Sequence, residues 1–141
     1  MVREAIGRLD GDGLIPGIAA RRMASRPLGP SLRAYSNTVV LVASRLPPPA
    51  VLARLKAIER EFGRRPGGQR WSSRVLDLDI VLWSGGTFAA PGLVIPHPRF
   101  RERVFVLRPA VTVVPEWRDP VTGFTVRQLH ARLTRPRAGH R

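Results

Sequence analysis

The sequence contains no cysteine, which excludes both a disulfide framework and a thiolate metal site. It also has no apolar run close to the roughly 20 residues that a membrane-spanning helix needs. The first ten residues carry acidic side chains and lack the apolar core of a signal peptide. We therefore expect a cytoplasmic protein that has no membrane partner.

Lysine is nearly absent as well. Lys56 is the only lysine, so arginine supplies the other 23 of the 24 basic residues, and the formal net charge is +14. The planar guanidinium suits phosphates, whether in a nucleotide or in a nucleic acid. A genome-wide bias toward arginine codons is the alternative, because the arginines are spread along the whole chain. The charge thus favours a polyanionic partner but does not identify it.

The apolar pattern indicates one small mixed domain, since 141 residues suit a single core. Residues at helical spacing predict helices, which we place over 2–9, 47–63, 99–107 and 125–133. Valine-rich or alternating runs predict strands, which we place over 18–26, 36–46 and 75–83. Two stretches, 64–73 and 84–98, are expected to be irregular.

Two of these helices have a defined apolar face. On the helix that begins near the three prolines, this face comprises Val51, Leu55, Ile58 and Phe62, and Gly63 is placed to end the helix. On the last helix, Val126, Leu129 and Leu133 are expected to point inward. Strands and helices interleaved in this way suggest an α+β fold over residues 1–133, and the basic tail 134–141 is expected to be disordered.

The stretch RWSSRVLDLDIVLW, residues 70–83, alternates aliphatic and acidic side chains. In a strand, Asp77 and Asp79 project from one face, whereas the aliphatic side chains between and around them project from the other. Their Cα atoms would lie roughly 6.5–7 Å apart, so both carboxylates could reach one metal cluster. An antiparallel strand with one face in water would show the same alternation without any site.

Three segments, 25–37, 59–79 and 96–105, place polar side chains in apolar surroundings. Phosphoryl-type transfer needs divalent metal held by carboxylates, cations around the phosphates and a loop that excludes water. Mg²⁺ prefers one or two carboxylates together with phosphate oxygens and water. The two aspartates and the arginines before them could meet these needs.

At this point the residues resemble a family. The stretch 70–83 and LVIPHPRFRERVFVLRPA (93–110) are similar to 6-hydroxymethyl-7,8-dihydropterin pyrophosphokinase, an enzyme of folate biosynthesis. RPLGP (26–30), AYSN (34–37) and IEREFGR (58–64) occur in the same order and at similar separations. The resemblance covers roughly residues 2–133.

The resemblance implies transfer of a pyrophosphoryl group from ATP to the hydroxymethyl group of the reduced pterin, with release of AMP. It implies that Asp77 and Asp79 bind two Mg²⁺ ions that bridge the ATP phosphates. The other residues implied at the nucleotide are Arg64 and Arg74 on the triphosphate, Trp71 closing the loop, Glu59 and Ile80 beside the nucleotide, and His97 and Arg103 on phosphates.

For the pterin, the resemblance implies that Tyr35 and Phe105 flank the flat ring. Asn37 would hydrogen-bond its edge, and the backbone around Ser25, Pro27 and Leu28 would contact the remainder. Each side chain also has an ordinary structural interpretation. The two aromatics could belong to the core, His97 to a loop and Asn37 to a turn, and Glu59 could pair with a basic neighbour on its helix.

The resemblance also implies a ferredoxin-like antiparallel sheet flanked by helices. The family opens with a strand that ends in Gly-Ser-Asn, whereas this sequence begins within the helix that follows, so the first strand is expected to be missing. That strand would be central, beside the Asp-x-Asp strand. A start codon placed too late, a shortened and impaired homologue, or a strand supplied by swapping would each explain this.

Two other functions stay open. One is a catalytically weakened member of the same fold that acts in binding or scaffolding. The other is a nucleic-acid-binding module, which the charge favours but which would need a basic helix with interleaved aromatics or a known motif. Neither feature is found, so no specific nucleic-acid partner is expected. The primary expectation is a Mg²⁺-dependent pyrophosphokinase with ATP and a reduced pterin as substrates.

Overall fold

The computed structural model describes residues 2–11, 13–20, 23–25, 35–63 and 76–136. The elements in chain order are α1 (Val2–Arg8), β1 (Leu14–Ala19), β2 (Met23–Ser25), β3 (Tyr35–Asn37), β4 (Val40–Ser44), α2 (Pro48–Gly63), β5 (Phe88–Ala90), β6 (Leu93–Ile95), the 3₁₀ helix η1 (Phe100–Glu102), α3 (Val104–Val113) and α4 (Val126–Thr134). The described strands form three antiparallel pairs, β1–β4, β2–β3 and β5–β6. The fold is therefore of the expected mixed α+β kind.

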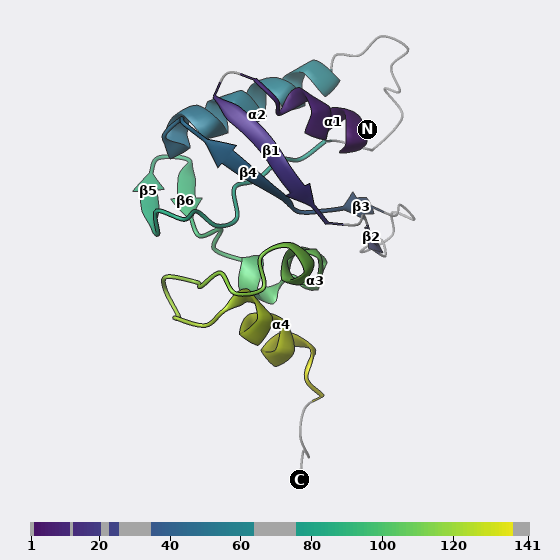
Figure 1. The fold of residues 1–141 in the computed structure, drawn as a ribbon, viewed down its shortest axis with the longest axis vertical. Helices are drawn as coiled ribbons and strands as arrows, with labels where there is room; N and C mark the ends of the chain where they lie inside the picture. The colour runs from purple at the N-terminus through teal and green to yellow at the C-terminus, as the bar shows by residue number, and fades with distance from the viewer. Residues whose placement is uncertain (1, 12, 21–22, 26–34, 64–75, 137–141) are drawn as a thin grey trace.

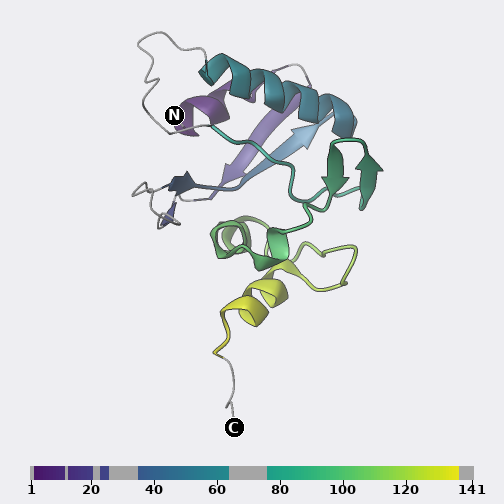
Figure 2. The same cartoon turned by 180° about the vertical axis from the view of Figure 1, so that it is seen from behind.

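The elements are arranged along the long axis of the molecule (Figure 1). At one end α1 and α2 lie along the β1–β4 pair, and at the other end η1, α3 and α4 lie together. The β5–β6 hairpin lies beside the first half of α2, as the view from behind also shows (Figure 2). None of the described helices is long and apolar enough to cross a membrane.

One apolar cluster joins the helices to the Asp-x-Asp segment. Leu9, Leu55 and Ile58 are buried in it, and the partly buried side chains around them are Val42, Val51, Phe62, Leu76, Leu78 and Ile80. The predicted apolar face of α2 is thus confirmed, and Gly63 is the last residue of that helix. The aliphatic side chains of residues 76–80 face the helix, whereas Asp77 and Asp79 are exposed, so the predicted alternation is confirmed.

The prediction of a strand over 75–83 is wrong for the part that is described, because residues 76–83 are extended but pair with none of the described strands. Two backbone groups of residues 76–82 bind described residues outside the segment. The Leu78 N–H donates to the Glu59 side chain, and the Val81 carbonyl accepts from the His97 N–H. Apolar packing and these two bonds therefore hold the segment in place of a ladder.

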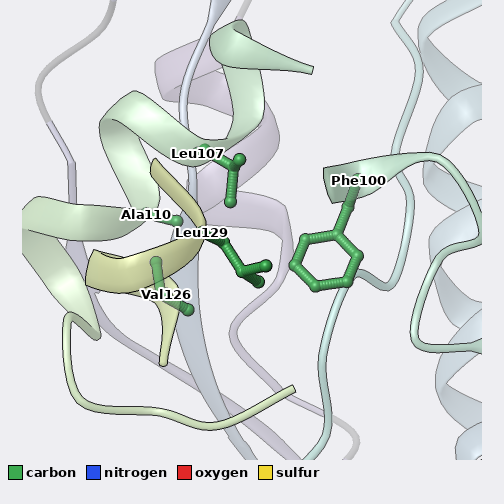
Figure 3. Close-up of a cluster of buried hydrophobic side chains, with 5 residues drawn as sticks. All are labelled: Phe100, Leu107, Ala110, Val126 and Leu129. Carbon is green, nitrogen blue, oxygen red and sulfur yellow. The ribbon is translucent and has the colours of Figure 1, made fainter. Parts of the chain in front are cut away.

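A second apolar cluster forms the other end of the molecule (Figure 3). Its buried members are Phe100, Leu107, Ala110, Val126 and Leu129, which come from η1, α3 and α4. Val81 and Leu82 pack against this cluster, so the extended segment 76–82 links both cores.

The helix predicted over 99–107 is in fact two elements. The Arg103 N–H closes the 3₁₀ turn on Phe100, and Arg103 itself is extended, with φ −108° and ψ 101°. The α-helix α3 begins only after it and continues past Pro109 to Val113. The break fixes where the side chains of Arg103 and Phe105 lie.

The strand predictions near the N-terminus are wrong in their bounds. The run predicted over 18–26 is divided between β1 and β2, and the run over 36–46 is divided between β3 and β4. Within β1, the register against β4 also shifts between Pro16 and Ala19. Directly after β1, Ala20 forms two hydrogen bonds with the residues between β3 and β4. Its carbonyl accepts from the Thr38 hydroxyl, and its N–H donates to the Val39 carbonyl.

The stretch 84–98 is not irregular throughout, because it contains the β5–β6 hairpin. Pro91 and Gly92 form its two-residue turn, and Gly92 has φ +78°. Proline at the first central position and a positive-φ glycine at the second fit a type II turn. The Pro-Gly pair between two apolar triplets was the signal for this hairpin.

The last helix begins at a capping box. The Thr125 hydroxyl accepts the Gln128 N–H, and the Gln128 side chain accepts the Thr125 N–H. Val126 and Leu129 point inward as predicted, but Leu133 is 39% exposed, so its prediction is wrong. Thr134 belongs to α4, one residue into the predicted tail, and residues 137–141 lie outside the described part of the chain.

Thr125→Ala is expected to destabilise the protein by about 1 kcal/mol, because the orphan N–H at the start of α4 loses its acceptor. Thermal unfolding followed by circular dichroism measures the effect. Thr87→Ala, at an exposed site outside any helix or strand, is the matched control. Equal midpoints for the two variants would show that the capping box contributes nothing.

A buried carboxylate ties η1 to the turn before α4. Asp119 is fully buried, and both its oxygens bind the Arg101 guanidinium, at 2.5 Å from Nε and 2.7 Å from Nη2. The Thr122 hydroxyl and the Val121 N–H donate to it as well. Burial by itself raises the pKa of Asp119, but these hydrogen bonds outweigh burial and lower the pKa to about 2. The pair is therefore ionised at neutral pH.

Candidate functional site

The two aspartates lie on the exposed side of the extended segment. Asp79 has a side chain 40% exposed, and its Oδ2 lies 3.9 Å from His97 Nε2. No hydrogen bond or ion pair joins Asp77 to another described residue. Among the described residues no group of three or more histidine, cysteine or acidic side chains gathers. The donor set is thus a pair of carboxylates, which suits a metal that takes its other ligands from phosphate and water.

A pocket of about 300 Å³ opens beside Asp79. Lys56 and His97 supply its other ionisable side chains. The remaining lining residues come from α2, the extended segment, the β5–β6 hairpin and the turn that follows it, and they are Leu52, Ile80, Gly92, Leu93, Val94 and Pro98. A mainly apolar wall with a few convergent polar groups is typical of a small-molecule site.

His97 is fixed by backbone bonds on both sides. Its N–H donates to the Val81 carbonyl at 2.9 Å, and its Nδ1 accepts the Arg99 N–H at 3.1 Å. When Nδ1 accepts, a neutral imidazole carries its proton on Nε2. The nitrogen nearest Asp79 is therefore a donor, which can bind a phosphate oxygen at the pocket.

Glu59 lies behind the aspartates. Its Oε2 accepts the Leu78 N–H at 2.5 Å and lies 3.3 Å from Lys56 Nζ. Leu78 is the residue between the two aspartates. Glu59 therefore contacts the backbone of the carboxylate segment, a contact that the sequence analysis did not foresee.

The described residues that are expected around the pterin lie on the β2–β3 pair and α3, apart from the residues that line the pocket beside Asp79. Ser25 is opposite Tyr35 in the β2–β3 pair, and Asn37 is opposite Met23. This pair lies beside α3, which carries Phe105 (Figures 1 and 2). The Arg103 guanidinium lies 5.7 Å from the centre of the Phe105 ring. The structure thus brings the expected strand residues close to the helix of the expected aromatic residue.

Five expected site residues, Arg64, Trp71, Arg74, Pro27 and Leu28, lie outside the described residues. The sequence analysis in turn missed Lys56 and the hairpin residues that line the pocket. Lys56 could have been found from its spacing, because it lies one helical turn before Glu59 and hence on the same side of α2.

Known proteins of one family are similar to this chain. The family model described as 7,8-dihydro-6-hydroxymethylpterin-pyrophosphokinase (HPPK) matches residues 1–115. A relative from Synechocystis, named 2-amino-4-hydroxy-6-hydroxymethyldihydropteridine pyrophosphokinase, is 38% identical over 120 residues, or 82% of this chain and 61% of the relative. A protein of the same name from Pseudomonas aeruginosa is 39% identical over 97 residues, or 68% of this chain and 59% of the relative.

A folate synthesis bifunctional protein from Arabidopsis thaliana is also similar, with 39% identity over 80 residues, or 57% of this chain and 16% of that protein. The chain spans about three fifths of the length of the two bacterial relatives that it matches.

Proposed function

The chain belongs to the HPPK family, and on that premise we propose that it transfers a pyrophosphoryl group from ATP to 6-hydroxymethyl-7,8-dihydropterin. The observation that carries the proposal is the pocket that Asp79, His97 and Lys56 share, with Asp77 on the same side of the segment. Carboxylates for a metal, a cation and an imidazole donor for phosphates, and an apolar wall for a base are the parts that such a reaction needs.

Asp77 and Asp79 fit a pair of Mg²⁺ ions. Both are exposed, and neither forms an ion pair with a lysine or arginine among the described residues. Mg²⁺ held by these carboxylates would supply positive charge that offsets the charge on the transferred group. The two carboxylates would hold the ions on the exposed side of the segment, and the packing of Leu76, Leu78 and Ile80 on the apolar cluster fixes that orientation.

The chain's own cations complete the nucleotide site. Lys56 Nζ and the Nε2–H of His97 bind phosphate oxygens, and Ile80 with the other aliphatic lining packs against the base. Arg103 reaches the phosphates from the start of α3. The remaining roles follow from the family resemblance, with Arg64 and Arg74 on the triphosphate and Trp71 closing over it.

The acceptor binds between the β2–β3 pair and α3. Tyr35 and Phe105 flank the pterin ring, Asn37 binds its edge, and the backbone of Ser25, Pro27 and Leu28 contacts the remainder. The pterin hydroxyl oxygen attacks the β-phosphorus of ATP, and the bond from that phosphorus to the α–β bridging oxygen breaks. AMP leaves, and the hydroxyl proton passes to solvent. The protein's contribution is positioning and charge stabilisation.

The sheet in this proposal is ferredoxin-like, within one domain over residues 1–133. Its support is the antiparallel β1–β4 pair covered by α1 and α2, with residues 76–80 packed on the same apolar cluster as Val42 of β4.

The test is incubation of the purified chain with ATP, Mg²⁺ and the reduced pterin, followed by chromatography of the nucleotides. We expect AMP in a one-to-one ratio with the pterin diphosphate, and no product after chelation of Mg²⁺ with EDTA. Release of ADP in place of AMP would indicate transfer of a single phosphoryl group and refute the proposal. Binding of an ATP analogue without any AMP formation would instead favour the weakened binding protein.

A further inference from the structure

We infer that Glu59 is a positioning residue, which holds Asp77 and Asp79 toward the pocket by binding the backbone between them. The inference rests on the proposed function and adds a residue that acts through the metal ligands. Its basis is the short bond from the Leu78 N–H to Glu59 Oε2, 2.5 Å long and formed by a carboxylate only 19% exposed.

The segment depends on this bond because no ladder to a described strand holds it. In a paired strand, several backbone bonds fix the register, and a slip of one residue turns every side chain to the other face. Residues 76–83 pair with none of the described strands. Such a slip would carry both aspartates into the apolar cluster, so apolar packing and the few backbone bonds of the segment together decide where the carboxylates lie.

The position of Glu59 suits this role. It projects from α2, the most regular neighbour of the segment, and Ile58 beside it is fully buried, so the helix cannot shift easily. Glu59 thereby connects the carboxylate segment to a rigid element.

Lys56 extends the connection to the pocket. Its Nζ lies 3.3 Å from the same Glu59 oxygen, and the side chain also lines the pocket beside Asp79. The cation offsets the negative charge of Glu59, which would otherwise repel a polyphosphate. Lys56 and Glu59 together place one positive group and the proposed metal ligand Asp79 at one opening.

Two substitutions of Glu59 separate the effect of its side-chain length from the effect of its charge. Glu59→Gln keeps the length of the side chain and an oxygen acceptor but removes the charge, whereas Glu59→Asp keeps the charge and shortens the side chain by one methylene. If the bond to Leu78 is what matters, Gln preserves the function and Asp does not. Glu61→Asp is the matched control, because Glu61 is exposed on the same helix and pairs with Arg8.

The first measurement is hydrogen exchange of the Leu78 amide in the full chain labelled with ¹⁵N-leucine, with Leu78→Val to assign its signal. We expect exchange at least about tenfold faster in Glu59→Asp than in the wild type, and near wild-type exchange in Glu59→Gln and Glu61→Asp. The second is Mn²⁺ binding by electron paramagnetic resonance in the presence of a non-hydrolysable ATP analogue. Affinity should fall about 10–100-fold in Glu59→Asp alone, as for other groups that orient metal ligands.

Unchanged Leu78 exchange in Glu59→Asp would overturn the inference. A loss of Mn²⁺ affinity without faster exchange would also overturn it, because Glu59 would then act on the nucleotide or metal directly. Equal losses in Gln and Asp would assign the effect to charge and refute a positioning role. None of these readouts needs turnover, so a wild-type chain that forms no AMP would refute the proposed function and leave this inference to the exchange and binding data.

Discussion

Asp79→Asn is expected to lower the rate of AMP formation by on the order of a thousandfold, which corresponds to about 4 kcal/mol of transition-state stabilisation. The reason is the loss of an anionic metal ligand at the pocket wall. An amide oxygen has nearly the same size and position but is a weaker ligand for Mg²⁺, because it lacks the negative charge that attracts the ion.

Asp77→Asn should act comparably, since both carboxylates project from one side of the segment and each is proposed to hold Mg²⁺ there. Neither change should unfold the protein, because both side chains are exposed and carry no bond that holds the core. Asp10→Asn, at an exposed aspartate after α1, is the control with the same chemical change.

Steady-state AMP formation and Mn²⁺ binding should be measured on the same preparations of the Asp79→Asn variant. The expected pattern is a loss in both for Asp79→Asn, with wild-type unfolding midpoints and an unaffected control. Retention of full activity and of wild-type Mn²⁺ affinity would exclude Asp79 as a metal ligand. Normal Mn²⁺ affinity combined with lost activity would point instead to the contact with His97.

The sequence predicted best what short-range geometry decides. The apolar face of α2 and the alternation around Asp77 depend only on the spacing of side chains along one element, so both are confirmed. The prediction of a strand over 75–83 is wrong because strand pairing depends on a partner elsewhere in the chain. The Leu78 N–H donates to Glu59, which lies 19 residues earlier in the chain. No local sequence pattern predicts such a side-chain acceptor.

The candidate site divides in the same way. The family resemblance named Asp79, His97 and Ile80, and the structure places all three at one pocket. The family resemblance did not name Lys56, which lines the pocket only because α2 and the β5–β6 hairpin meet there. The roles of the arginines and of Trp71 in the loop before the aspartates remain predictions.

Arg101→Gln is expected to lower the free energy of unfolding by about 3 kcal/mol, the lower end of the range for breaking a buried pair. The change leaves the fully buried Asp119 without its bidentate partner. Thr122 and Val121 still donate to the carboxylate, which is why we expect the lower end. Arg101 also lies 4.8 Å from the centre of the Phe100 ring, so the truncated side chain uncovers part of the second core. For a domain of this size the unfolding midpoint should fall by roughly 10 °C.

The same pair predicts a response to acid. The pKa of Asp119 is lowered from 3.8 to about 2, so the folded state binds this proton less readily than the unfolded chain. A depressed pKa contributes stability that is present above pH 4 and is lost as the pH falls from about 4 to about 2. The shift corresponds to about 2 kcal/mol for this buried group. Asp119→Asn should remove that part of the acid dependence.

Denaturant unfolding at pH 7 and at pH 3, for Arg101→Gln, Asp119→Asn and the double variant, separates these contributions. Because the two side chains form one unit, the double variant should lose less than the sum of the single losses. Arg108→Gln, at an exposed arginine of α3, is the matched control and should stay within about 0.5 kcal/mol of the wild type. Strict additivity, or equal losses in Arg101→Gln and Arg108→Gln, would show that the pair does not hold η1 to the turn before α4.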